Sequence, residues 1–303
     1  MSKYTHTVTE AEAEEKLTIN QIIKRNFKFS RRFKTKMKFQ ALIDLNGEPS
    51  PGFLTPKPGD IISIRLPEEG SDFPPEDIPV DIIYEDDDII IVNKQPGLIV
   101  HPTKGHPYHT LANGLMKYML DNDKNFKIRF ANRVDMDTSG IIVVAKNSNV
   151  QNDISLQLRR KSVEKKYLAI VKGIMEDDEQ RIDLPVGRPD PEDVKRGILS
   201  EENGGKSAVS DIKVIERFRD HTLVEVTILT GRTHQIRVHL SHIGHPIAGD
   251  KLYGGEEPEL IDRQALHAYR ITFDHPGNGE KLSIEAPPPA DFREALEKLK
   301  QNR

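Results

Sequence analysis

The stretch that decides the fold is NRVDMDTSGIIVV, residues 132–144. Its polar first part leads directly into the apolar, β-branched run Ile141 to Val144, a pattern typical of a loop that precedes a buried strand. In such a loop the nearby Arg133 favours the ionised form of Asp135, and a charged carboxylate is a usable nucleophile or base. The commoner role of an arbitrary aspartate is an Asx turn, in which Asp135 or Asp137 accepts backbone N–H bonds. This stretch alone leaves both interpretations open.

Further apolar runs on both sides of this stretch predict more strands, at residues 89–92, 167–171 and 223–229. The last of these alternates apolar and polar residues, as a strand with one face in water requires. Helices are predicted at residues 111–120 and 150–158. Because strands and helices do not alternate regularly, we expect an α+β domain built on a mixed or antiparallel sheet rather than a Rossmann fold.

The 303 residues correspond to about two domains of roughly 150 residues each. We expect a disordered, acidic tail at residues 1–12 and a small α+β domain at 13–66, in which a helical pair is followed by short strands. Residues 67–79 contain Pro74-Pro75 and five acidic residues, so we expect a linker that does not pack. The larger α+β domain then covers residues 80–303.

Composition excludes several classes of protein. The absence of cysteine removes disulfides, thiol nucleophiles, iron–sulfur clusters and cysteine-ligated zinc. No apolar run approaches the roughly 18 residues of a membrane-spanning helix. The N-terminal residues are acidic and lack an apolar core, so we expect a cytoplasmic protein with no membrane partner. Neither G-x-G-x-x-G nor G-x-x-x-x-G-K-[ST] occurs, and we therefore expect no nucleotide cofactor.

The net charge of −4 conceals an uneven distribution of charge. Nine lysines and arginines lie between Lys16 and Lys38, and no acidic residue occurs from Lys16 to Ile43. A face that is merely solvated usually mixes both signs of charge. The run therefore predicts a surface that binds a polyanion.

Residues 230–250 form a second polar segment, which contains four histidines: His234, His239, His242 and His245. Histidines at this spacing on a helix could bind a metal ion and support a metal-dependent hydrolase. However, no glutamate lies between Thr230 and Ala248, and Arg232 and Arg237 would place positive charge beside the metal ion. We therefore expect no metal, and keep the hydrolase as the less favoured alternative.

Three segments together resemble the motifs of the RluA class of pseudouridine synthases. Residues 132–140 resemble the signature His-Arg-Leu-Asp-x-x-Thr-Ser-Gly, with Asn132 in place of the histidine and Val134 in place of the leucine. Residues 93–102 resemble the first family motif and 166–173 the second. The third is matched within residues 231–254, and the similarity extends from Ile83 to about Glu285. Since Asn132 does not titrate, any role that needs an imidazolium there is excluded.

This resemblance implies that the chain isomerises uridine to pseudouridine in structured ribosomal or transfer RNA, after flipping the uridine out of its stack. The base leaves C1′ through N1 and rejoins it through C5, so no cofactor is required. By the family pattern the catalytic residues are Asp135, Tyr167 and Arg237. Arg133 would fill the gap left by the flipped uridine. The other substrate-binding residues are Thr138, Arg232, His234 and Gln235.

Residues 13–66 resemble an S4 RNA-binding module through Phe29 to Arg32, Asn46-Gly47 and Pro58 to Asp60. The RNA-binding residues would be Lys24, Arg31, Arg32 and Lys34. We expect a monomer whose partner is RNA. In the alternative of a non-catalytic RNA-binding protein, the basic stretch would bind RNA and Asp135 would have no purpose.

Overall fold

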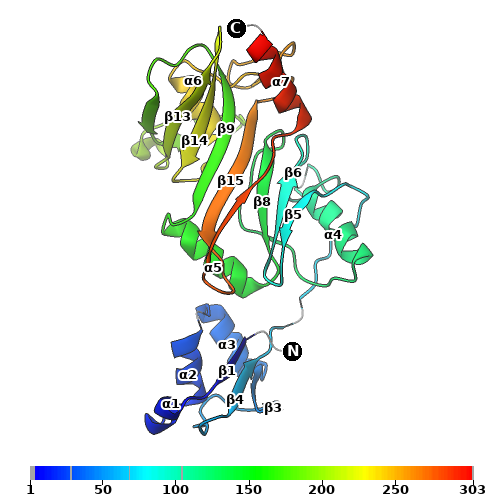
Figure 1. The fold of residues 1–303 in the computed structure, drawn as a ribbon, viewed down its shortest axis with the longest axis vertical. Helices are drawn as coiled ribbons and strands as arrows, with labels where there is room; N and C mark the ends of the chain where they lie inside the picture. Colours follow the sequence, from blue (N-terminus) through cyan, green and yellow to red (C-terminus); the bar gives the residue numbers. More distant parts are fainter. Residues whose placement is uncertain (1–3, 28, 68, 104, 302–303) are drawn as a thin grey trace.

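The computed structural model describes residues 4–27, 29–67, 69–103 and 105–301. They form a small N-terminal module and a larger module, which follow one another along the long axis of the molecule (Figure 1). The side chains of Arg31, Arg32 and Lys38 lie outside the described residues. The RNA contacts predicted for Arg31 and Arg32 therefore stay predictions.

The N-terminal module packs its helices against a four-stranded sheet of strand order β1-β4-β2-β3. Alternate residues of one strand, Ile62 and Ile64, pack in a buried cluster with Ile22 and Phe33 from the helices. In chain order its elements are β1 (Tyr4–Thr7), α1 (Glu10–Glu14), α2 (Ile19–Asn26), α3 (Arg31–Phe39), β2 (Ile43–Leu45), β3 (Glu48–Pro49) and β4 (Ile61–Ile64).

The prediction of a disordered tail at residues 1–12 is wrong for residues 4–12. Strand β1 pairs antiparallel with β4, and Thr9 caps α1 in a capping box with Glu12. The buried Glu12 carboxylate also accepts a hydrogen bond from the Asn26 amide at 2.9 Å and lies 2.8 Å from the His6 ring. These partners offset the cost of burying its charge. Acidic composition does not reveal such a network.

The large module is built on a ten-stranded sheet, in which β15 pairs with β8 in parallel and the other pairings are antiparallel. The expected mixed sheet of an α+β domain is confirmed. No helix among the described residues is long and apolar enough to cross a lipid bilayer. In chain order the elements are β5 (Ile82–Glu85), β6 (Ile89–Lys94), α4 (Leu111–Asp121), β7 (Arg129–Phe130), β8 (Ser139–Ala145), α5 (Ser148–Arg159), β9 (Glu164–Lys172), β10 (Glu179–Asp183), β11 (Val186–Gly187), β12 (Gly197–Ile198), a 3-10 helix (Glu201–Asn203), β13 (Val209–Arg217), β14 (His221–Ile228), α6 (Gln235–His242), β15 (Leu266–Asp274), β16 (Lys281–Glu285) and α7 (Ala290–Gln301).

Residues 67 and 69–79 carry no helix or strand, but the expectation that they do not pack is wrong. Phe73 and Ile78 pack against the hydrophobic cluster around α4. The Asn113 side-chain amide donates a hydrogen bond to the Pro74 carbonyl at 2.8 Å. The apolar side chains of the connection thus attach it to the large module despite its prolines and charges.

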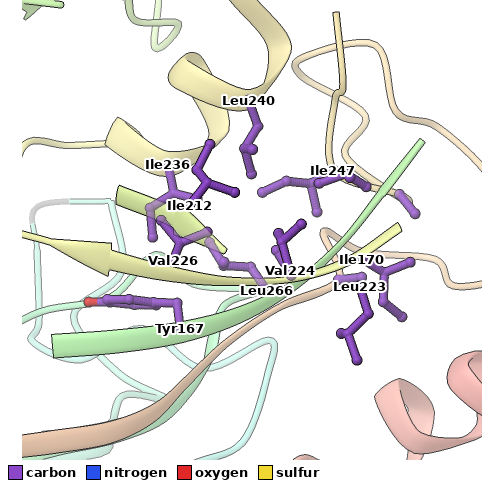
Figure 2. Packing of buried hydrophobic residues seen from close by; sticks show 14 of the residues in the cluster. Tyr167, Ile170, Ile212, Leu223, Val224, Val226, Ile236, Leu240, Ile247 and Leu266 are labelled. Atoms are coloured by element: carbon purple, nitrogen blue, oxygen red, sulfur yellow. The ribbon is translucent and has the colours of Figure 1, made fainter. Parts of the chain in front are cut away.

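Strands β6 and β8 contain the continuous apolar runs 89–92 and 141–145 because helices cover both of their faces. Ile89 and Ile91 pack in one cluster with Ile154 of α5, whereas Ile90 packs in another with Leu115 of α4. A third cluster joins β9 and β14 to α6 (Figure 2). Because Tyr167 belongs to this third cluster, the packing fixes β9 relative to the helix that carries Arg237.

Gly140 lies where β8 comes closest to β15. Its φ is +107°, and a Cβ atom there would lie 2.2 Å from the Ala268 carbonyl oxygen. Only glycine allows this approach, because any side chain would collide with backbone atoms. The crossing holds the end of the loop 132–138 against β15.

We expect Gly140→Ala to destabilise the protein by at least about 3 kcal/mol, because the strained φ and the backbone clash add. The matched control is Gly279→Ala, where φ is +77° and no atom lies within 4 Å of the added Cβ. It should cost only about 1–2 kcal/mol. Urea unfolding of both variants measures the difference, and equal losses would contradict the steric argument.

Candidate active site

A cavity of about 1640 Å³ lies between the large module and helix α3 of the small one. The loop before β8, strand β9 and the start of α6 all contribute to its wall. Three segments that are distant in sequence therefore meet at one place. All eight predicted catalytic and substrate-binding residues line this cavity: Arg133, Asp135, Thr138, Tyr167, Arg232, His234, Gln235 and Arg237.

Arg237 is held by a buried ion pair with Asp250. Its Nε and Nη2 atoms donate to the two carboxylate oxygens of Asp250 at 2.7 and 2.8 Å. Asp250 is fully buried and also accepts backbone N–H bonds from Leu252 and Tyr253. The Tyr253 ring centroid lies 5.0 Å from the guanidinium carbon. This bidentate geometry leaves Arg237 little freedom to move.

The third guanidinium nitrogen of Arg237, Nη1, contacts Asp135. Nη1 donates to Oδ2 of Asp135 at 3.2 Å, across 102 residues of sequence. The turn itself is closed by the backbone, since the Thr138 N–H donates to the Asp135 carbonyl at 3.1 Å. Among the described residues, no backbone N–H bonds to the Asp135 carboxylate. The Asx-turn interpretation therefore does not describe Asp135, whose half-buried carboxylate belongs to the cavity.

Tyr167 is buried on β9, opposite Val226 of β14 and Ala268 of β15. In Figure 2 its ring lies at one end of the hydrophobic cluster and its oxygen points away from the other labelled side chains. Burial raises the pKa of the Tyr167 hydroxyl, and the negative charge of Asp135 raises it further. The hydroxyl therefore stays protonated at neutral pH.

His234 lies beside Asp135 and adopts a left-handed backbone conformation, with φ of +57°. Its Nε2 atom is 3.8 Å from Asp135 Oδ2, and Nδ1 bonds with the Tyr253 hydroxyl at 2.9 Å. Burial lowers the pKa of His234, and the charges of Arg237 and Arg196 lower it further, against the opposing effect of Asp135. His234 therefore contacts the site as a neutral ring.

The four histidines of residues 234–245 do not converge on a point. His239 bonds with Ser210 and the Leu184 carbonyl, and His245 with the Lys172 carbonyl. Within the described part of the chain, the one group of three residues able to hold a metal is Asp86, Asp88 and His275, which does not line the cavity. The hydrolase alternative thus has no converging histidine ligands at this site.

Arg133 is exposed at the cavity wall. A plain ion pair with the nearby Asp137 would be a purely structural role for Arg133, but no such pair exists among the described residues. Asp137 instead offers its backbone carbonyl to Arg263 at 3.0 Å. Arg133 is thereby placed to contact a ligand.

Two of the predicted substrate-binding residues position their neighbours. Gln235 is buried, donates to the Val209 carbonyl and Ser210, and accepts from Thr230 and the Arg232 N–H. These bonds fix the loop that leads into α6. Thr138 is likewise buried and accepts a hydrogen bond from Gln264 at 3.3 Å.

Asn132 binds the loop to its own strand. Its side-chain amide donates to the Ile141 carbonyl at 2.9 Å, and its carbonyl oxygen accepts the Val143 N–H at 2.8 Å. An uncharged amide supplies a donor and an acceptor together, so it imitates a backbone pairing along β8. The asparagine at this position therefore has a structural role that needs no imidazolium.

Lys94 holds the backbone of the loop 132–138 in place, a role that was not predicted from the sequence. It is fully buried, and its Nζ donates to the Met136 and Gln95 carbonyls at 2.8 Å each. Burial lowers the pKa of Lys94 to about 7, against the opposing charge of Asp137. Only its position after the apolar run of β6 could have indicated burial.

Lys165 and Lys36 also line the cavity and were not among the predicted site residues. Lys165 lies two positions before Tyr167, and alternation along a strand places both on one face. Burial and the charge of Arg232 lower the pKa of Lys165 to about 8. Of the predicted RNA-binding residues, Lys24 is exposed and Lys34 half-buried, and neither lines the cavity.

Comparisons with known proteins give concordant results. Residues 88–242 match the family model described as RNA pseudouridylate synthase. The chain is 44% identical over 250 residues to the uncharacterized RNA pseudouridine synthase YlyB of Bacillus subtilis, a match that covers 81% of this chain and 82% of that protein.

Two further matches add to this. The chain is 40% identical over 250 residues to ribosomal large subunit pseudouridine synthase D of Neisseria meningitidis, which covers 79% of this chain and 66% of that protein. The structure of human RNA pseudouridylate synthase domain containing 1 is similar at a TM-score of 0.59 and 27% identity, over 71% of this chain and 86% of that one.

The buried Lys94 generates a prediction about pH. Because its pKa is lowered to about 7, the unfolded state holds one more proton than the folded state between pH 7 and the ordinary lysine range. The folded state should therefore become more stable as pH rises above 7. Lys94 should increase the equilibrium constant for folding by up to about tenfold per pH unit.

We expect Lys94→Met to remove this slope, as measured by urea unfolding at pH 7, 8 and 9. Lys213→Met, at an exposed position of β13, serves as the control and should follow the wild-type curve. Parallel pH profiles for wild type and Lys94→Met would contradict the assignment.

Proposed function

This chain belongs to the RNA pseudouridylate synthase family, and on that premise we propose that it modifies ribosomal RNA with Asp135 as the acting carboxylate. Its reaction is the isomerisation of uridine to pseudouridine in RNA. A relative that is 40% identical bears the name of a ribosomal large subunit enzyme, which supports ribosomal RNA as the substrate. The observation that carries the proposal is the chain of ion pairs from Asp250 through Arg237 to Asp135, next to the Tyr167 ring.

The reaction breaks the bond between N1 and C1′, turns the uracil and forms a bond between C5 and C1′. The C5 proton leaves, N1 gains a proton, and no electrons are transferred, so the chemistry needs no cofactor. Asp135 attacks the sugar, attacks the base or removes a sugar proton, and each of these steps needs an ionised carboxylate. Arg237 donates a hydrogen bond to that carboxylate at 3.2 Å.

Tyr167 supplies the surface on which the detached uracil turns. An aromatic ring tolerates rotation of a stacked base, whereas a fixed hydrogen bond would oppose it. Since burial and Asp135 raise the pKa of the hydroxyl, Tyr167 stays protonated at neutral pH and offers no phenolate to accept a proton. This favours stacking as its main contribution.

The cations of the cavity wall bind the RNA around the flipped uridine. Arg133, which is exposed and makes no ion pair with Asp137, stacks in the gap that the uridine leaves. Lys165 and Arg232 line the same wall and suit the phosphates of the flipped nucleotide. The N-terminal module adds phosphate contacts through its basic helices, which is the role of an S4-like module.

All eight predicted catalytic and substrate-binding residues come from one chain and line one cavity, which supports action as a monomer. Ribosomal RNA as the substrate supports a place in the cytoplasm. We assign residues 13–66 to RNA binding and residues 80–303 to catalysis, with β1 and α1 as part of the first module.

Asp135→Asn should bind RNA and yield no detectable pseudouridine, because it keeps the shape of the side chain and removes its charge. The matched control is Asp137→Asn, two residues on, which should stay within about twofold of wild type because its carboxylate makes no ion pair among the described residues. Both are measured as pseudouridine formed in transcribed large-subunit ribosomal RNA. An active Asp135→Asn beside an inactive Asp137→Asn would overturn every assigned role.

Tyr167→Phe should bind RNA as wild type does, because the ring remains. Tyr167→Ala should weaken binding of the flipped base by about 1–3 kcal/mol, the usual contribution of one stacked base. Binding is measured by fluorescence anisotropy and turnover by pseudouridine formation. A lower rate in Tyr167→Phe at unchanged affinity would add a proton transfer by the hydroxyl, and full activity of Tyr167→Ala would refute the stacking role.

A further inference from the structure

Glu69 lies between two cations that come from different modules. Its carboxylate oxygen Oε1 is 3.1 Å from Nζ of Lys36, on helix α3 of the N-terminal module. The other oxygen bonds with Nη2 of Arg129, on strand β7 of the large module. Glu69 itself belongs to the segment that connects the two modules. One carboxylate thus joins three parts of the chain.

The surroundings of this contact are strongly positive. Among the described residues, eight lysines and arginines line the cavity, against two carboxylates, Glu69 and Asp135. Asp135 has its place in the chemistry, but Glu69 has none there. Burial alone would raise the pKa of Glu69, yet hydrogen bonds and charges from Lys36 and Arg129 lower it, so the side chain is an anion.

We propose that Lys36 and Arg129 form a binding site for a backbone phosphate of the RNA substrate, and that Glu69 occupies this site in the free protein. The inference rests on the proposed function and adds a subsite to it. A phosphodiester carries one negative charge on two unbridged oxygens, as a carboxylate does. An arginine fork and a lysine amine bind either group in the same way.

The geometry favours exchange of the two anions. The Glu69 side chain is 29% exposed and that of Lys36 34%, so both can move into solvent. The Arg129 side chain is only 9% exposed, and its Nη1 donates to the Lys127 carbonyl at 2.9 Å. Arg129 therefore stays in place while Glu69 leaves. A phosphate bound there would contact both modules at once, in the same cavity as Asp135.

The alternative is that Glu69 is a permanent tether that holds the modules together. The two models predict opposite effects of Glu69→Gln on RNA binding. If Glu69 competes with phosphate, its neutralisation should tighten binding roughly three- to tenfold, the equivalent of two partly exposed ion pairs. The slope of log affinity against log salt should steepen by about one phosphate, or roughly 0.7–0.9.

The probe is a labelled RNA hairpin of about 20 base pairs, because phosphate contacts do not depend on sequence. Asp72→Asn is the matched control, since it removes the same charge from an exposed position of the same segment. It should change affinity much less than Glu69→Gln does. In a Lys36→Met/Arg129→Met background, which should itself bind RNA more weakly, Glu69→Gln should have no further effect.

Unchanged or weaker binding by Glu69→Gln would overturn the inference and identify a tether. The proposed function would survive that result, provided that the wild-type protein still forms pseudouridine in ribosomal RNA. Failure of the wild-type protein to bind RNA would instead overturn both. Equal tightening by Glu69→Gln and Asp72→Asn would show a general charge effect and would also count against the site.

Discussion

The buried ion pair between Asp250 and Arg237 is the interaction on which the geometry of the site depends. A charge as deep as Asp250 is tolerated because a bidentate partner and two backbone N–H groups satisfy it. Such pairs contribute little net stability, so its importance lies in orientation. It turns Nη1 of Arg237 towards the loop that carries Asp135. Loss of Asp250 would remove the two short bonds that orient Arg237 and leave Asp135 as its remaining carboxylate partner among the described residues.

The other half of the site is positioned by backbone packing. The loop with Asp135 ends at Gly140, whose lack of a side chain lets β8 approach β15. Asn132 pairs with β8 at one end of the loop, and Lys94 binds the Met136 carbonyl in its middle. Three independent attachments therefore hold a short loop that has no regular structure. Such support suits the catalytic role proposed for Asp135, since small displacements of a reacting group are costly to rate.

The resemblance to the RluA motifs, rather than the local pattern of residues, indicated Asp135, Tyr167 and Arg237 as site residues. The structure places all three at one cavity. The structural roles of Asp250, Lys94 and Glu69 were not predicted, because they depend on partners that are distant in sequence. Asp250 acts through Arg237. Glu69 binds a lysine 33 residues away and an arginine 60 residues away.

The amino-acid composition led to wrong predictions for two segments of the chain. The acidic first residues looked disordered, yet the Glu12 carboxylate is satisfied by Thr9, His6 and Asn26, partners that single-residue charge cannot disclose. The connection at 67–79 looked like a solvated linker, although Phe73 and Ile78 attach it to the large module. In both places a few specific contacts outweigh the average polarity of the segment. The sheet was easier to predict, because continuous and alternating apolar runs record directly how many faces of a strand are buried.

The division of Arg237 between two carboxylates bears on the role proposed for Asp135. Asp250 takes Nε and Nη2 at 2.7 and 2.8 Å, and Asp135 receives one longer contact at 3.2 Å. That contact engages Oδ2, as does the 3.8 Å approach of His234, while Oδ1 accepts no hydrogen bond among the described residues. A carboxylate bound through both oxygens would lose its basicity and nucleophilicity to its partner. One oxygen of Asp135 is thus anchored, and the other has no hydrogen bond among the described residues, as the proposed chemistry in the cavity that Tyr167 also lines requires.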